Sequence, residues 1–102
     1  MIKLTQRQKE VVDKFHALER EHGEGNIYVR YINDCWNVMF VIHKKGDSNV
    51  TLMLKEENKI NRSIFNALEK KGLMQPTDIN HNPVEDANYT GGVAYLGCRI
   101  TI

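Results

Sequence analysis

The sequence contains few of the residues and patterns that mark several protein classes. Its 102 residues include only two cysteines, Cys35 and Cys98, which are too far apart for the close pairs of a zinc or redox motif. The longest apolar run is 38–42, far too short to cross a membrane. The start, 1–6, also lacks the apolar run of a secretory signal. We therefore expect a cytoplasmic protein with two buried, reduced thiols and no membrane partner.

The charges nearly cancel, and no motif for catalysis is present. Fourteen Lys and Arg against thirteen Asp and Glu give a formal net charge of +1, and 41% of the residues are hydrophobic. These figures are typical of one globular domain over 1–102. The four histidines form no HExxH motif, and no GxSxG motif or phosphate-binding glycine loop occurs. The prediction is a protein that is not an enzyme, with no metal and no cofactor.

The first segment with a clear pattern is a helix over 6–21. Thr5 and Gln8 have the spacing of a capping box, in which each side chain satisfies a backbone N–H of the other residue. Apolar residues follow at helical spacing: Val11, Val12, Phe15 and Leu18. Gly23 then supplies the stop.

Three strand-like runs follow this helix, at 26–32, 36–43 and 50–54. They are rich in β-branched and aromatic residues, and turn residues separate them. Because the connections are short, the runs predict an antiparallel meander.

A second helix is expected over 59–71, with Asn58 as its cap and Gly72 as its end. Its apolar face holds Ile60, Ile64, Ala67 and Leu68. An extended segment at 73–79, a loop at 80–92 and a strand at 93–102, broken at Gly97, complete the chain. The expected order is α-β-β-β-α-β-β, an α+β domain.

The other face of the second helix carries groups that bind nucleic acid, namely Lys59, Arg62, Ser63, Asn66 and Lys70, with one acid, Glu69. Lysine and serine contact phosphates, whereas arginine and asparagine read the edges of guanine and adenine. The same composition also suits a helix face that simply meets solvent. Residues 44–71 carry seven cations against four acids, which favours a nucleic-acid partner modestly.

Two segments resemble winged-helix DNA-binding domains. Leu4-Thr5-Gln6-Arg7-Gln8 opens a helix as in the first helix of many of them, and residues 60–74 are similar to a recognition helix that runs into the wing. The resemblance implies that Arg62, Ser63, Asn66 and Lys70 enter the major groove of double-stranded DNA while Lys59 contacts a phosphate. Residues 73–79 and 93–102 would form the wing hairpin, and the protein would be a small, dimeric transcriptional regulator or accessory factor.

The chain departs from the winged-helix pattern between its two helices. The family has a short helix where this sequence has some thirty strand-like residues. Either a β-meander is inserted into a winged-helix core, or the resemblance is local. Three acids in the wing segment, Asp78, Glu85 and Asp86, would repel phosphates if they faced DNA.

The order α-β-β-β-α also resembles a double-stranded-RNA-binding domain, but Lys59 and Arg62 replace that family's lysine cluster poorly.

A protein–protein interaction module or small inhibitor is the alternative function. Its contact surface would be an aromatic sheet, built from Tyr28, Tyr31, Trp36, Tyr89 and Tyr95. Aromatic residues dominate binding hot spots when they are exposed, although in a domain this small they also fill the core. Strand edges at 26–32 or 93–102 would pair with a partner or with a second copy in a homodimer.

Overall fold

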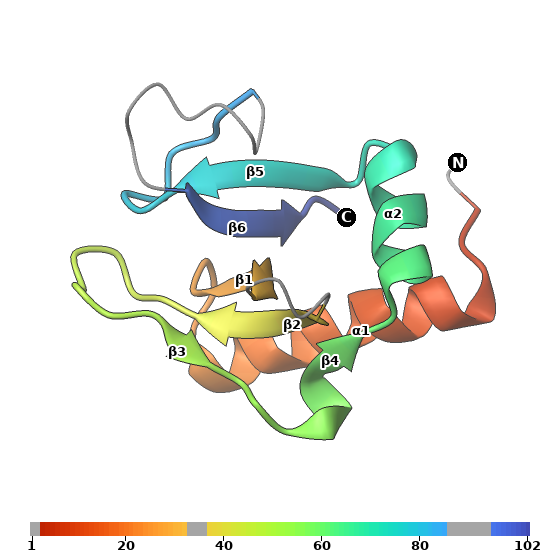
Figure 1. Cartoon of the computed structure of the whole chain (residues 1–102), viewed down its shortest axis with the longest axis horizontal. Coiled ribbons are helices and arrows are strands. Elements are labelled where there is room, and N and C mark those ends of the chain that lie inside the picture. The colour runs from red at the N-terminus through yellow and green to blue at the C-terminus, as the bar shows by residue number, and fades with distance from the viewer. Residues whose placement is uncertain (1–2, 33–36, 86–94) are drawn as a thin grey trace.

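An open, antiparallel sheet of six strands carries two helices (Figure 1). The computed structural model describes residues 3–32, 37–85 and 95–102. Its elements are α1 (Gln6–His22), β1 (Ile27–Ile32), β2 (Asn37–Ile42), β3 (Thr51–Leu52), the 3₁₀ turn η2 (Glu56–Asn58), β4 (Lys59–Ile60), α2 (Arg62–Lys70), β5 (Met74–Asp78) and β6 (Tyr95–Ile100). The α+β class is confirmed, and the observed order differs from the expected one by the extra strand β4.

The sheet has the strand order β3-β2-β1-β6-β5, and β4 pairs with β2 beside β3. β1 and β2 form a hairpin in register from Ile27↔Ile42 to Ile32↔Asn37. The predicted antiparallel meander is therefore present. The prediction that β1 and β6 offer free edges is wrong, because β1 lies between β2 and β6, and β6 lies between β1 and β5.

Helix α1 begins with the predicted capping box. The Gln8 N–H donates to Thr5 Oγ1 over 3.2 Å, and the Thr5 N–H donates to Gln8 Oε1 over 3.1 Å. At the other end the Gly23 N–H donates to the Glu19 carbonyl. Because both signals are local in the sequence, this helix could be predicted to within one residue.

Helix α2 starts three residues later than predicted. Lys59 and Ile60 form strand β4 opposite Met39 and Val38, and Ile60 is buried there. Asn61, and not Asn58, caps the helix, since its Oδ1 accepts the Ser63 N–H over 2.8 Å. Ile60 fits a helical apolar stripe, but in the structure it fills the core from a strand, so its periodicity was misleading.

β3 and β5 also have shorter bounds than predicted. β3 holds only two residues; β6 continues through Gly97, but its pairing with β5 shifts register next to Gly97, between Thr77↔Gly97 and Asp78↔Tyr95. β5 and β6 form the expected hairpin, from Met74↔Ile100 to Asp78↔Tyr95. The part of the predicted loop beyond residue 85, together with Cys35, Trp36 and Tyr89, lies outside the described residues.

The main core lies on the sheet face that α1 and α2 cover. It is built from Val12, Phe15, Leu18, Ile27, Val29, Val38, Phe40, Ile60, Phe65, Leu68, Leu73, Met74, Cys98 and Ile100. Side chains alternate along a strand, so a second, smaller cluster occupies the opposite face, with Tyr28, Val41 and Leu96. Tyr28 is only 1% exposed. The prediction that it belongs to an aromatic contact surface is therefore wrong.

Candidate nucleic-acid interface

The outer face of α2 is open to solvent along the helix. Arg62, Ser63, Asn66 and Lys70 are all exposed, whereas Phe65 and Leu68 are buried beneath them. The helix lies at one end of the sheet, next to the start of β5, and none of the described strands crosses its outer face (Figure 1). The structure thus brings four of the five predicted site residues together on one exposed helix face.

Lys59, the fifth predicted residue, does not lie on this helix. It belongs to β4, and its Nζ forms an ion pair with Glu56 Oε2 over 2.9 Å. Exposed pairs of this kind contribute little free energy, so a phosphate group can compete for the ammonium group. Lys59 still lies close to α2, because only Asn61 separates β4 from Arg62.

A groove beside the start of α2 adds two cations that the sequence reasoning missed. It encloses about 410 Å³ between α1, β4 and α2. Arg7, Lys14 and Lys59 line it together with two acids, Glu10 and Glu57. Arg7 and Lys14 are seven residues apart and so lie on the same face of α1. The sequence alone was therefore enough to predict that Arg7 and Lys14 share a helix face. Only the tertiary structure places this face against β4 and α2.

Lys71 has a structural role. Its Nζ donates to the Lys3 carbonyl over 2.8 Å and to Gln8 Oε1 over 2.7 Å. These bonds join the end of α2 to the start of α1. The cation therefore orients the two helices relative to each other and does not belong to the exposed face.

One of the three acidic residues in the hairpin segment, Asp78, is bound within its own turn. Asp78 is only 6% exposed, and its Oδ1 accepts the N–H groups of Asn80 and Asn82. The Asp78 carboxylate is therefore bound by backbone N–H groups of the turn that follows it. Glu85 is exposed, and Asp86 lies outside the described residues.

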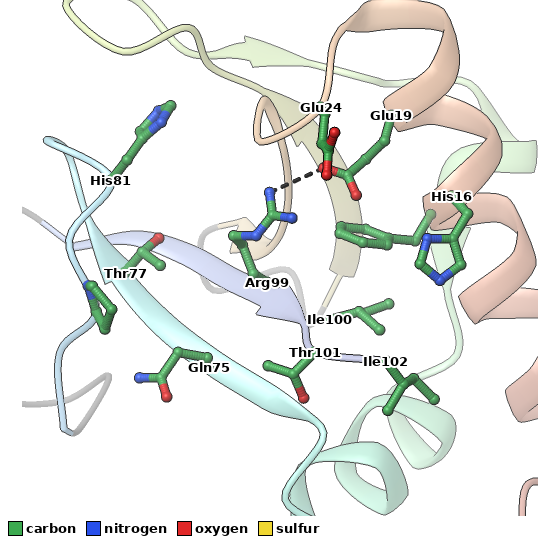
Figure 2. A pocket seen from close by; sticks show the side chains of 12 residues that line it. His16, Glu19, Glu24, Gln75, Thr77, His81, Arg99, Ile100, Thr101 and Ile102 are labelled. Atoms are coloured by element: carbon green, nitrogen blue, oxygen red, sulfur yellow. Dashed lines mark ion pairs between the residues drawn. The ribbon is translucent and has the colours of Figure 1, made fainter.

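A second concavity, of about 450 Å³, lies between α1 and the β5–β6 hairpin (Figure 2). Arg99 forms its inner wall and lies 3.0 Å from Glu19 Oε2 through its Nη1. This contact is an ion pair without a hydrogen bond, because no acceptor meets the direction of the Nη1–H bonds. Arg99 also lies over the Phe15 ring, 5.4 Å from its centroid. These contacts connect α1 to β6, which is a structural role for both charged residues.

The buried thiol Cys98 has the surroundings of an inert cysteine. It is 1% exposed, and its Sγ lies 3.2 Å from the Tyr95 hydroxyl. Burial raises the pKa of Cys98, and burial likewise raises the pKa of Tyr95. A nucleophilic cysteine needs the opposite, a lowered pKa and access to solvent.

Comparison with known proteins finds no matching family model, no matching curated protein and no matching solved structure. Among residues 3–32, 37–85 and 95–102, no three His, Cys, Asp or Glu side chains are grouped so that they could hold a metal ion. No helix in these ranges is long and apolar enough to cross a bilayer. The geometry of this chain alone therefore carries the functional argument.

Proposed function

We propose that the protein is a non-enzymatic binder of double-stranded DNA that inserts the outer face of α2 into the major groove. The exposure of Arg62, Ser63, Asn66 and Lys70 on one face of α2 carries this proposal. Arg62 would read guanine and Asn66 adenine, while Ser63 and Lys70 would contact phosphates. A small transcriptional regulator or accessory factor is the role that fits such a domain.

Phosphate contacts beside the groove would come from Arg7, Lys14 and Lys59. These three residues line the protein groove next to the start of α2. If α2 lay in the major groove of DNA, the sugar–phosphate backbone of the DNA would pass at this position. The β5–β6 hairpin directly follows α2, as a wing would in a winged-helix domain, and the β-meander would be an insertion between α1 and α2.

The test is fluorescence anisotropy with mixed-sequence duplex DNA at low and at physiological salt. We expect Arg62→Glu/Lys70→Glu to weaken binding at least roughly tenfold, because it removes two favourable contacts and adds two repulsive charges. The matched control, Lys9→Glu/Arg20→Glu, changes the charge equally at exposed positions of α1 that do not line the groove. It should change the affinity less than about threefold.

Two results would contradict the proposal. Equal losses in both variants would show that overall charge, and not α2, determines binding. No binding of wild type at about 100 μM and low salt would exclude DNA as the partner, since non-specific binding is usually tighter than this.

A protein partner is the second candidate, and the edge strand β3 favours it. Leu52 is 40% exposed and Leu54 is 67% exposed beside an edge with unpaired backbone groups. Such an edge can accept a strand from another chain or from a second copy. Sedimentation of wild type and of Leu52→Lys/Leu54→Lys would test this: a dimer that the variant loses supports pairing at β3, and a wild-type monomer contradicts self-pairing.

A further inference from the structure

Two histidines join segments that are distant in the sequence. His43 follows β2 and is 1% exposed, whereas His81 lies in the segment after β5. His43 Nδ1 lies 2.8 Å from His81 Nε2, and His43 Nε2 lies 2.9 Å from the Asp47 carbonyl oxygen. The side-chain bond thereby connects the β2–β3 turn to the residues that follow β5.

The partners fix which nitrogen atoms carry hydrogen. A carbonyl oxygen only accepts, so His43 Nε2 must donate to Asp47. When His43 is neutral, its Nδ1 is an acceptor, and His81 Nε2 must donate to it. One added proton on His81 Nδ1 keeps this hydrogen bond but places a positive charge in the buried site. A second proton, on His43 Nδ1, would place two N–H groups and two positive charges against each other.

The surroundings of the pair disfavour positive charge. The Tyr28 ring lies 5.1 Å from the His81 ring, and the small cluster of Tyr28, Val41 and Leu96 lies beside it. Burial lowers the pKa of His81 most, and the charges of His43, Lys45 and Arg99 lower it further.

The carboxylates of Asp47, Asp78 and Glu19 have other partners. Oδ1 of Asp47 accepts the Asn49 N–H, and Oδ1 of Asp78 accepts two backbone N–H groups. Glu19 pairs with Arg99, and Glu24, like Glu19, lines the cleft that His81 borders. Within the described residues no carboxylate forms an ion pair with either histidine.

The backbone conformation of His81 also depends on its surroundings. Its φ of +66° lies in the left-handed region, which residues with a Cβ adopt uncommonly. The His81 N–H donates to the Asp78 carbonyl, and the ring bond to His43 is the second restraint. Loss of the ring bond would therefore leave the His81 N–H bond as the remaining restraint on this conformation.

We propose that His43 and His81 form a proton-operated latch, which holds the 43–49 turn against residues 79–85 and opens when His81, bonded to His43 in this buried site, takes up a proton. Opening uncovers Tyr28 and moves His81, which lies at one border of the 450 Å³ cleft (Figure 2), together with Pro83, which also lines it. The latch makes the shape of that cleft and of residues 79–85 depend on pH. It is independent of the proposed DNA binding.

The direction of the pH dependence follows from linkage. The pKa of His81 in the closed form is lower than its ordinary 6.5, so the closed form binds fewer protons than the open form. As pH falls below about 6.5, the equilibrium moves toward the open form.

Nuclear magnetic resonance on the whole chain tests the latch in two ways. At pH of about 8, side-chain ¹⁵N shifts should show both rings as the Nε2–H tautomer. On acidification, amides of 43–49 and 79–85 should shift together and exchange with solvent at least about tenfold faster, while amides of α1 and α2 stay unchanged.

The decisive variant is His81→Gln, whose amide can donate from about the same place but cannot take up a proton. It should abolish the shared acid transition, and His16→Gln, a half-exposed histidine without a hydrogen bond in the described structure, should retain it. A transition that persists in His81→Gln, separate transitions of the two segments, or an Nδ1–H tautomer of His43 would each overturn the proposal. Should His81→Gln fail to fold, the wild-type tautomer and titration decide it.

Discussion

At the scale of single residues, the close approach of β1 and β6 depends on a missing side chain. A Cβ at Gly97 would lie 2.8 Å from the Val29 carbonyl oxygen and 3.3 Å from Tyr28 Cβ. Both neighbours belong to β1, and one is backbone, so neither moves easily. Gly97 lets the β5–β6 hairpin join the β1–β2 hairpin in one sheet. From the sequence, Gly97 was predicted only to break a strand.

We expect Gly97→Ala to lower the free energy of unfolding by about 2 kcal/mol, since the added methyl group overpacks this junction. Urea denaturation followed by circular dichroism measures the change. Gly46→Ala is the control, because Gly46 also has a positive φ but has no atom within 4 Å of the added Cβ. Its cost should be near 1 kcal/mol, from backbone strain alone. Equal costs at both positions would show that steric overlap with Val29 is unimportant.

At the scale of elements, the start of α2 determines which residues its outer face presents. Two asparagines precede the helix, and both are common caps. The pairing of β4 with β2 uses Lys59 and Ile60 in extended form, so the helix can begin only after Ile60. Asn61 then accepts the Ser63 N–H, while Asn58 is buried in η2 without a partner for its Oδ1.

Replacing Asn61 with alanine should cost about 1 kcal/mol of unfolding free energy, the usual effect of losing a helix cap. Ser63→Ala, at an exposed position in the first turn of the same helix, should change stability by less than about 0.5 kcal/mol. Urea midpoints of the two variants provide the comparison. If Asn61→Ala proved as stable as Ser63→Ala, the cap would contribute nothing to α2.

At the scale of the whole molecule, the ion pair of Glu19 and Arg99 joins the first helix to the last strand. The Glu19 side chain is 9% exposed and the Arg99 side chain 28%. Glu19 Oε2 also accepts the Gly25 N–H over 2.7 Å, so one carboxylate restrains α1, the following turn and β6. Removing one charge from such a pair leaves the other partly buried without compensation.

We expect Glu19→Gln to lower the free energy of unfolding by about 2 kcal/mol, less than for a fully buried pair because Arg99 keeps some contact with water. The glutamine oxygen can still accept the Gly25 N–H, so the variant isolates the effect of the charge. Glu24→Gln, an exposed carboxylate on the same cleft, should change stability by less than about 0.5 kcal/mol. Equal melting temperatures of Glu19→Gln and Glu24→Gln in thermal unfolding would contradict this prediction.

Local signals in the sequence determined α1, the hairpins and the polar face of α2, though not where α2 begins. The capping box of Thr5 and Gln8 and the turn residues act within a few positions, so their effect does not depend on the rest of the chain. The periodicity of α2 correctly separated Arg62, Ser63, Asn66 and Lys70 from its buried side. The DNA-binding role stays a prediction, because neither this pattern nor any known protein tests it.

Only the tertiary structure decided which segments lie side by side. It placed β1 between β2 and β6, turned Ile60 into a strand residue and brought Arg7 and Lys14 next to Lys59. It also brought together His43 and His81, which are 38 positions apart. Such contacts depend on how strands pair across the whole sheet, and strand pairing is set by the combined burial of many side chains. Local patterns of neighbouring residues therefore do not predict which strands pair.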